Sequence, residues 1–159
     1  MKRIIVIGCP GSGKSTFSRR LRDTVGYPLY HLDMIYHKPD RTTVSREEFD
    51  RRLREIMEGE CWIIDGNYNR TIEMRLKECD TVFLFDLPTE VSVKGVISRI
   101  GKKREDMPWV EEKFDEEFRD VILGFRENQL PRIYDLLSKY PEKKVVIFKS
   151  HADADSFLM

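Results

Sequence analysis

The sequence predicts an α/β protein built on a mainly parallel β-sheet, and three observations support this prediction. Short apolar runs alternate with segments whose apolar residues recur at helical spacing. The runs are rich in β-branched and aromatic residues and lack inward–outward alternation, so they suit strands that are buried on both faces of a sheet. The alternation of strand and helix continues over the whole length, which is typical of parallel α/β folds.

The candidate strands are five apolar runs, at residues 3–7, 29–32, 61–64, 82–85 and 145–148. The first candidate helix follows the first strand and has one apolar face made by Phe17, Leu21 and Val25. Gly26 is a candidate C-cap for this helix, because glycine readily adopts the left-handed conformation that ends many helices.

The second candidate helix begins at Ser45 and Glu48, which match a capping box, and Gly59 ends it. Its apolar face consists of Phe49, Leu53, Ile56 and Met57. A third, short helix is expected over residues 71–77.

A fourth helix is expected from Thr89, with an inward face of Val93, Val96, Ile97 and Ile100. A longer segment follows, with the apolar residues Phe114, Phe118, Val121, Ile122 and Phe125. Pro131 should kink or restart this segment, because proline cannot donate the backbone hydrogen bond of a helix interior. The apolar face then continues through Ile133, Leu136 and Leu137, and residues 152–158 form a last short helix.

Length and composition predict one domain, residues 1–159, because domains usually hold about 100–200 residues and no linker or repeat interrupts the chain. Hydrophobic residues make up 40% and charged residues 35%, which excludes a collagen-like, low-complexity or disordered chain. Lys and Arg total 28, as do Asp and Glu. The zero net charge argues against a nucleic-acid partner held by bulk electrostatics.

The sequence also indicates in which cellular compartment the protein is expected. The apolar run of residues 4–7 is too short for a signal peptide, and no run approaches the roughly 18–20 residues that cross a bilayer. The three cysteines, Cys9, Cys61 and Cys79, form no close pair and do not resemble a disulfide framework or a zinc site. We expect a cytoplasmic protein with reduced thiols and no membrane partner, either a monomer or a homodimer.

A phosphate-binding loop is the strongest motif. Gly8-Cys9-Pro10-Gly11-Ser12-Gly13-Lys14-Ser15 matches G-x-x-x-x-G-K-[ST], between an apolar strand and an amphipathic helix. Such a loop points backbone N–H groups at one anion, and the following helix adds its positive N-terminus. Lys14 would reach the β- and γ-phosphates, and the Ser15 hydroxyl would bind magnesium. The candidate nucleotide contacts are Gly8, Pro10, Gly11, Ser12, Gly13, Lys14, Ser15 and Thr16.

Three candidate strands end in an aspartate: Asp33, Asp65 and Asp86. Ligands of open α/β sheets bind beyond the carboxyl ends of the strands, and phosphoryl transfer needs carboxylates for magnesium and for the acceptor. We therefore interpret Asp33 and Asp65 as functional, with Asp33 also a candidate magnesium ligand. Asp86 precedes Leu-Pro-Thr, and we interpret it as a turn or capping residue.

A basic cluster, Arg99, Lys102, Lys103 and Arg104, follows the fourth helix. These cations can complement the dipole at the end of that helix. They can also form a lid, at about residues 101–109, that closes over a triphosphate and stabilises the transferring phosphoryl group. We assign Arg99 and Arg104 to the second role.

Other residues are candidate acceptor contacts. Tyr68, Arg70 and Arg75 follow Asp65-Gly66, and the two arginines could hold an anionic substrate, although the Asn and Gly residues there also favour a plain turn. His37 and Trp109 could line a substrate pocket or lie on the surface. His31 is expected to pack inside. A helix N-terminus beside Cys9 could lower the pKa of its thiol.

Together these segments resemble the small P-loop kinases related to adenylate kinase, and most closely the bacterial DNA topology modulation proteins. The resemblance covers nearly the whole chain. Besides the phosphate-binding loop, it rests on Pro28-Leu29-Tyr30-His31-Leu32-Asp33, Trp62-Ile63-Ile64-Asp65-Gly66-Asn67-Tyr68, Phe83-Leu84-Phe85-Asp86-Leu87-Pro88, Gly101-Lys102-Lys103-Arg104-Glu105-Asp106-Met107 and residues 145–150.

The resemblance implies a single P-loop kinase domain of the nucleoside monophosphate kinase type, with a short lid and five parallel strands in the order 2-3-1-4-5 between two layers of helices. It implies ATP and Mg²⁺ as cofactors, with Asp65 holding magnesium through water and Arg99 and Arg104 as lid arginines. Adenylate kinases follow their Asp-Gly with Phe-Pro-Arg, whose arginine contacts the nucleotide substrate, whereas this chain has Asn67-Tyr68-Asn69.

The leading functional hypothesis is an ATP-dependent kinase whose small-molecule acceptor is a nucleoside monophosphate or a small hydroxylated or anionic compound. Lys14, Asp33, Arg99 and Arg104 would be its catalytic residues. The alternative, from the name of the resembled family, is a nucleotide-binding regulator or ATPase linked to DNA topology, without a small-molecule acceptor. The chain has no basic tail and no DNA-reading motif, which argues against direct DNA contact.

Overall fold

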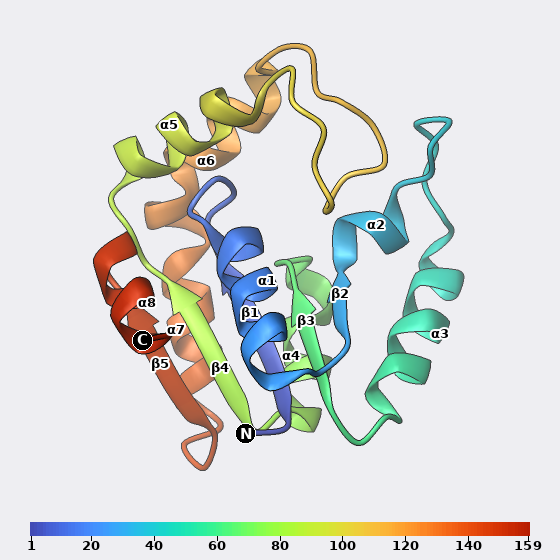
Figure 1. Cartoon of the computed structure of the whole chain (residues 1–159), viewed down its shortest axis with the longest axis vertical. Coiled ribbons are helices and arrows are strands. Elements are labelled where there is room, and N and C mark those ends of the chain that lie inside the picture. Colours follow the sequence, from blue (N-terminus) through green and yellow to red (C-terminus); the bar gives the residue numbers. More distant parts are fainter.

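Five parallel strands form one sheet through the centre of the molecule in the computed structural model, which describes residues 1–159 (Figure 1). The strands are β1 (Arg3–Gly8), β2 (Leu29–His31), β3 (Trp62–Asp65), β4 (Thr81–Phe85) and β5 (Lys144–Phe148). Their order, β2-β3-β1-β4-β5, confirms the predicted topology. In this register Val6 pairs with Asp65 and Gly8 pairs with Phe85, so the phosphate-binding loop leaves the sheet beside the ends of β3 and β4.

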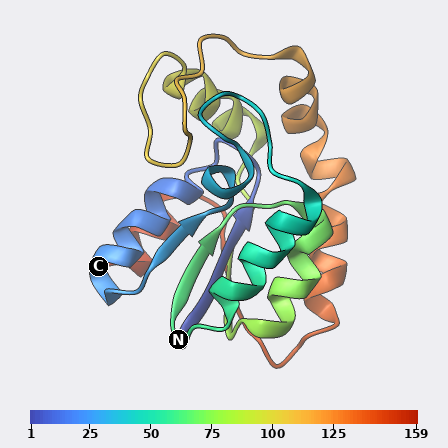
Figure 2. The same ribbon diagram turned by 90° about the vertical axis from the view of Figure 1, so that its right-hand side faces the viewer.

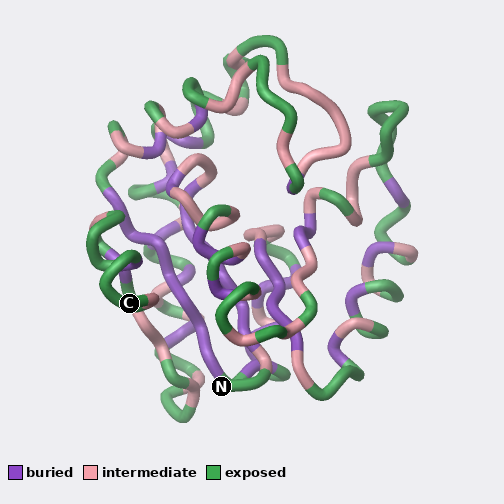
Figure 3. The backbone as a smooth tube through the Cα atoms, in the orientation of Figure 1, coloured by how far each residue is buried: buried purple, intermediate pink, exposed green.

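Helices cover both faces of the sheet, as predicted (Figure 2). They are α1 (Lys14–Val25), α2 (Leu32–Tyr36), α3 (Arg46–Met57), α4 (Asn69–Glu78), α5 (Thr89–Arg99), α6 (Glu116–Asn128), α7 (Leu130–Ser138) and α8 (His151–Phe157). One face buries residues of α1 and α8 against the sheet, and the other buries residues of α3 to α7. The strands are buried along most of their length because both faces are covered (Figure 3).

The helix ends follow the expected local chemistry in most places. Ser45 caps α3 by accepting a hydrogen bond from the Glu48 backbone N–H, and Gly26 ends α1 in the left-handed conformation. Pro131 lies in the first turn of α7, so it restarts the helical path after α6, as predicted. Ile97 was expected on the inward face of its helix, but it is exposed on α5.

The second strand is the main correction to the predicted elements. It ends at His31, and the next five residues form the short helix α2, which the sequence did not predict. Asp33 therefore lies on a helical turn rather than at a strand end. The apolar run of residues 29–32 looks like a single strand because Leu32 is apolar and buried like a strand residue, although it is the first residue of α2.

A long loop of residues 100–115 joins α5 to α6 and reaches over the carboxyl edge of the sheet toward α2 (Figure 1). The Gly101 N–H donates to the Glu111 carbonyl at 2.6 Å, which ties the two arms of this loop together. We call it the lid loop; it includes the predicted lid at 101–109 but is longer. Across the whole chain, none of the helices has the length and apolar character needed to cross a membrane.

Candidate functional site

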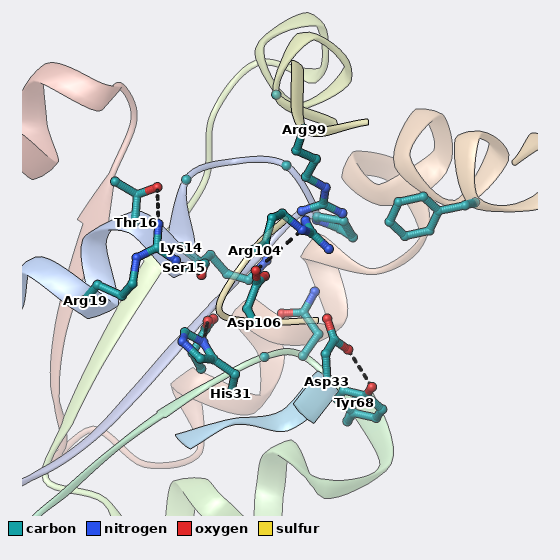
Figure 4. A pocket seen from close by; sticks show the side chains of 18 of the residues that line it. Lys14, Ser15, Thr16, Arg19, His31, Asp33, Tyr68, Arg99, Arg104 and Asp106 are labelled. Atoms are coloured by element: carbon teal, nitrogen blue, oxygen red, sulfur yellow. Dashed lines mark hydrogen bonds and ion pairs between the residues drawn. The ribbon is translucent and has the colours of Figure 1, made fainter. Parts of the chain in front are cut away.

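The principal cavity, of about 410 Å³, lies at the carboxyl edge of the sheet (Figure 4). It is lined by the phosphate-binding loop and the first turns of α1, by the ends of β2 and β3, by α5 and by the lid loop. Crevices at this edge of an open α/β sheet are where ligands bind. The position agrees with the site expected from the strand-end motifs.

The phosphate-binding loop, Gly8 to Ser15, forms the floor of the cavity, and we call it the cradle. Gly11 and Gly13 adopt φ angles of 79° and 101°, a left-handed region that side chains rarely occupy. At Gly8, with φ 147°, an added Cβ would lie 2.5 Å from the Phe85 carbonyl oxygen. These glycines let the chain turn from β1 into α1, whose N-terminal N–H groups are free to bind an anion.

Three residues that the sequence analysis did not assign hold the cradle in place. The Asn67 side-chain amide accepts from the Gly8 N–H at 2.9 Å and donates to the Gly8 carbonyl at 2.5 Å. Gly95 of α5 packs directly against the Gly11 carbonyl, leaving no space for a Cβ. His151, the first residue of α8, places Nε2 3.0 Å from the Ser12 carbonyl oxygen. The cradle is therefore braced by three separate parts of the chain.

Lys14 lies at the centre of the charges in the cavity. Its Nζ donates to the Cys9 carbonyl at 3.1 Å, within the cradle itself. Burial lowers the pKa of Lys14, whereas the carboxylates Asp65 and Asp33 act in the opposite direction. The Ser15 hydroxyl, the predicted magnesium ligand, accepts from Arg19 at 2.7 Å, so a second cation stands beside the cradle.

His31 and Asp65 form a buried pair at the ends of β2 and β3. His31 Nδ1 lies 2.8 Å from Asp65 Oδ2, within hydrogen-bond distance. His31 is buried, as predicted, but it also pairs with a carboxylate at the edge of the cavity. Its Nε2 has no hydrogen-bond partner although His31 is only 9% exposed, and His31 and Asp65 both line the cavity.

The donors around Asp65 fit a magnesium ion that arrives with phosphates. Magnesium usually keeps several waters and binds one or two carboxylates plus substrate phosphates. Ser15 and Asp65 both line the cavity beside the cradle and offer such oxygen ligands. No group of three or more His, Cys, Asp and Glu side chains is placed to hold a metal ion.

Asp33 and Tyr68 face each other on the far side of the cavity from the cradle (Figure 4). The Tyr68 hydroxyl donates to Asp33 Oδ1 at 2.6 Å, and His37 Nε2 lies 4.0 Å from the same oxygen. The Asp33 side chain is 44% exposed to solvent. Desolvation still raises the pKa of Asp33, and the Tyr68 hydrogen bond acts in the opposite direction. Burial, together with Asp33, also raises the pKa of Tyr68.

Aromatic rings pack behind Tyr68, and another aromatic contact joins His37 to the lid loop. Tyr36 and Phe49 lie 5.3 Å and 5.2 Å from Tyr68, measured between ring centroids. His37 packs against Trp109 of the lid loop at 5.1 Å, but neither ring lines the cavity itself. We call Asp33 and Tyr68 the acceptor wall; Tyr36 and Phe49 pack behind it and do not line the cavity.

Both predicted lid arginines line the cavity. Arg99 has its side chain 5.9 Å from the Phe118 ring, its Nε has no hydrogen-bond partner, and burial lowers its pKa. Arg104 is held by two acids of its own loop: Nε lies 3.5 Å from Asp106 and Nη2 lies 2.8 Å from Glu111. Arg99 thus retains unused donors, whereas Arg104 is already paired.

The structure moves two predicted acceptor contacts away from the cavity. Arg75 is fully buried, and its guanidinium donates to the Gly66 and Asn67 carbonyls; burial lowers its pKa to about 9. The expectation that Arg75 holds a substrate is wrong, because its donors are used to shape the turn after β3. Arg70 pairs with Asp50 of α3 at 2.8 Å and also does not line the cavity.

Two further expectations are corrected. Asp86 is not a capping residue: its carboxylate accepts from Arg126, Tyr134 and Lys149, each at 2.6 Å, and joins α6, α7 and the segment after β5. Burial would raise the pKa of Asp86, but these partners hold it below its usual value. Cys9 is buried, and burial raises rather than lowers the pKa of its thiol.

Comparison with known proteins agrees with this geometry. No family model matches the chain. It is 30% identical to the adenylate kinase of Thermotoga petrophila over 88 residues, which cover 54% of this chain and 39% of that protein. It is 32% identical to the adenylate kinase of Agrobacterium fabrum over 122 residues, which cover 72% of this chain and 60% of that protein. The chain thus spans about two fifths of the length of the first of these curated relatives.

Solved structures show the same fold. A shikimate kinase from Bacteroides thetaiotaomicron superimposes with a TM-score of 0.61 at 18% identity, over 99% of this chain and 94% of that one. A sugar kinase from Janibacter superimposes with a TM-score of 0.57 at 18% identity, over 99% of this chain and 90% of that one. The architecture is therefore that of the P-loop kinases.

Proposed function

We propose that the protein is an ATP-dependent phosphotransferase that moves the γ-phosphoryl group of Mg²⁺-bound ATP to a small-molecule acceptor. The observation that carries the proposal is the arrangement of one cavity: the cradle lies on one side, Asp33 lies opposite, and Arg99 from the end of α5 and Arg104 from the lid loop both line it. Adenylate kinase relatives and the P-loop kinase fold support it.

The cradle and α1 would bind the triphosphate. Backbone N–H groups from Gly11 to Thr16 would surround the β- and γ-phosphates at the positive N-terminus of α1. Lys14 would exchange its contact with the Cys9 carbonyl for phosphate oxygens. Ser15 and Asp65, the latter through water, would hold magnesium, which when bound supplies charge neutralisation on the phosphates.

Asp33 and the lid arginines would act on the transferring group. Asp33 would orient the acceptor or take its proton, and Tyr68 would fix the direction of the carboxylate. Arg99 and Arg104 would stabilise negative charge that spreads over the transferring phosphoryl group. Arg104 would first leave Asp106 and Glu111, so phosphate binding and rearrangement of the lid loop would be coupled.

The test is whether ADP formation depends on an acceptor. Purified protein is incubated with ATP, Mg²⁺ and a panel of nucleoside monophosphates and small hydroxylated metabolites. We expect at least one panel member to raise the rate clearly above that with ATP alone. ADP formation that ignores every acceptor but rises with DNA would instead support the regulator or ATPase linked to DNA topology.

A further inference from the structure

Positive and negative charges are separated across the cavity. Its four lining cations, Lys14, Arg19, Arg99 and Arg104, all belong to the cradle, α1, α5 or the lid loop. Of its three lining carboxylates, Asp33 lies at the opposite side on α2, Asp65 lies beside the cradle at the end of β3, and Asp106 belongs to the lid loop. The side where an acceptor would bind is therefore acidic, and the side where a triphosphate would bind is basic.

No arginine of α4 neutralises the negative charge on the acceptor side of the cavity. Both arginines of α4 that follow Asp65 in the sequence are committed elsewhere. Arg75 is used inside the protein by the Gly66 and Asn67 carbonyls, and Arg70 is paired with Asp50. Neither lines the cavity. An acceptor with a phosphate or carboxylate group would thus meet no cation of this wall.

The lining cations all stand on the side of the nucleotide. A Mg²⁺–triphosphate complex still carries roughly two negative charges near neutral pH. Lys14, Arg19 and Arg99 lie on that side, and Arg104 would join them once it leaves Asp106 and Glu111. On the other side of the cavity, Asp33 would repel an anionic acceptor, because like charges repel strongly in a partly buried site.

The chemistry of the acceptor wall is that of a hydroxyl-binding surface with an apolar backing. Tyr68 holds the Asp33 carboxylate by a 2.6 Å hydrogen bond, and Tyr36 and Phe49 pack behind the Tyr68 ring. A carboxylate of this kind accepts a hydrogen bond from a hydroxyl or ammonium group. The Tyr68 ring, which lines the cavity, can add apolar contact and, for a cation, attraction to its face.

We propose that the acceptor is a small hydroxyl compound that is uncharged or cationic and has an apolar face, rather than a nucleoside monophosphate or another anion. This inference rests on the proposed phosphotransferase function. The acceptor hydroxyl oxygen would form a bond to the γ-phosphorus while the bond from that phosphorus to the β–γ bridging oxygen breaks. The hydroxyl proton passes to the Asp33 carboxylate, and ADP leaves with the electron pair of the broken bond.

Matched acceptors test the proposal. Each pair shares a skeleton and differs by an anionic group: cytidine and cytidine monophosphate, glucose and gluconate, ethanolamine and glycolate. ADP formation is measured with saturating ATP and Mg²⁺. We expect the uncharged or cationic member of at least one pair to be used at least about 10-fold better, by kcat/KM, than its anionic partner.

The outcomes separate the inference from the function beneath it. Preferred use of the anionic members, or equal use within pairs, would overturn the inference while the phosphotransferase function stands. If no member of any pair raises ADP formation, the proposed function fails, and the inference fails with it.

A charge-neutral variant tests the cause of the discrimination. In Asp33→Asn, the anionic member of each pair should bind at least about 5-fold more tightly, as measured by calorimetry in the presence of ADP and Mg²⁺, because a repelling charge is removed. The dissociation constant for ATP should stay within about twofold, because Asp33 lies on the wall opposite the cradle. Asp120→Asn, on the exposed surface of α6, is the control and should change neither value. Unchanged binding of the anionic members to Asp33→Asn would contradict the electrostatic argument.

Discussion

The cradle and the acceptor wall face each other across one cavity but are built in different ways. The cradle is held through its backbone: Asn67, Gly95 and His151 contact the backbone of Gly8, Gly11 and Ser12. The acceptor wall is held by side chains that contact other side chains, such as Tyr68 on Asp33. A site held through the backbone is largely independent of side-chain identity, so it suits a ligand that many enzymes share. A site held by side chains can change its ligand when one of those side chains is substituted.

The largest effect is expected from Lys14→Ala, which removes the cation of the cradle. Transfer should fall by about 10³-fold or more, because charge on the β- and γ-phosphates would lose its main partner. The measurement is kcat with the best acceptor, together with the dissociation constant for ATP. Lys94→Ala, an exposed lysine of α5, is the matched control and should keep full activity. Normal turnover by Lys14→Ala would show that the cradle is not the nucleotide site.

Gly95→Val tests whether the cradle depends on backbone contact. The new side chain would occupy the place of the Gly11 carbonyl, so ATP should bind about 10- to 100-fold more weakly and the protein should lose about 1–3 kcal/mol of unfolding free energy. Calorimetry gives the affinity, and chemical denaturation gives the stability.

Gly124→Ala is the control for Gly95→Val, because it also changes a helix glycine. An added Cβ there would meet only the Asn128 side chain. We expect unchanged ATP affinity and a gain of up to about 1 kcal/mol, since alanine favours the helix over glycine. If Gly95→Val binds ATP like Gly124→Ala, the contact with Gly11 does not shape the cradle.

His31→Ala tests a positioning role at the border of the two regions. Without the Nδ1 hydrogen bond the Asp65 carboxylate can turn, so Mn²⁺ binding to the ADP complex should weaken about 10-fold. Electron paramagnetic resonance of bound Mn²⁺ measures this without turnover. His31→Asn, whose amide nitrogen can stand near the place of Nδ1, should restore much of the affinity. Equal Mn²⁺ affinity in His31→Ala and the unchanged protein would refute the role.

Asp86→Asn should affect stability and leave transfer unchanged, because Asp86 lies outside the cavity. The pKa of Asp86 is lowered in the folded protein, so its stabilising contribution is complete above the unfolded pKa of about 4 and is lost as the pH falls through the folded value. The variant should be less stable by about 1–2 kcal/mol at pH 7, and the difference should shrink below about pH 4. Urea unfolding across this pH range measures it; a constant difference would mean that the carboxylate charge is not responsible.

Local patterns in the sequence were enough to predict most of the fold. Apolar runs and glycine and proline positions located all five strands and most helices, and family resemblance supplied the strand order. The short helix α2 was missed because Leu32 is apolar and buried whether it belongs to a strand or to a helix.

The site was only partly predictable, because its supports come from distant segments. The motif located the cradle, and Asp33 and the lid arginines were assigned to the cavity that they line. Gly95 could have been recognised in the sequence, since a glycine inside a predicted helix usually marks a close packing contact. Asn67 resembled an ordinary turn residue. Arg75 was misassigned because no local pattern shows that its side chain points toward the protein interior.

The contact between His151 and the Ser12 carbonyl has a consequence for how the protein is made. These residues are 139 positions apart, so the cradle, among the first segments to be translated, gains this third brace only after α8 has emerged from the ribosome. Contacts of such long sequence separation form late, because the entropy of a large loop must be lost first. A chain stalled before α8 would contain the complete phosphate-binding motif and the contacts of Asn67 and Gly95, but not the support from His151.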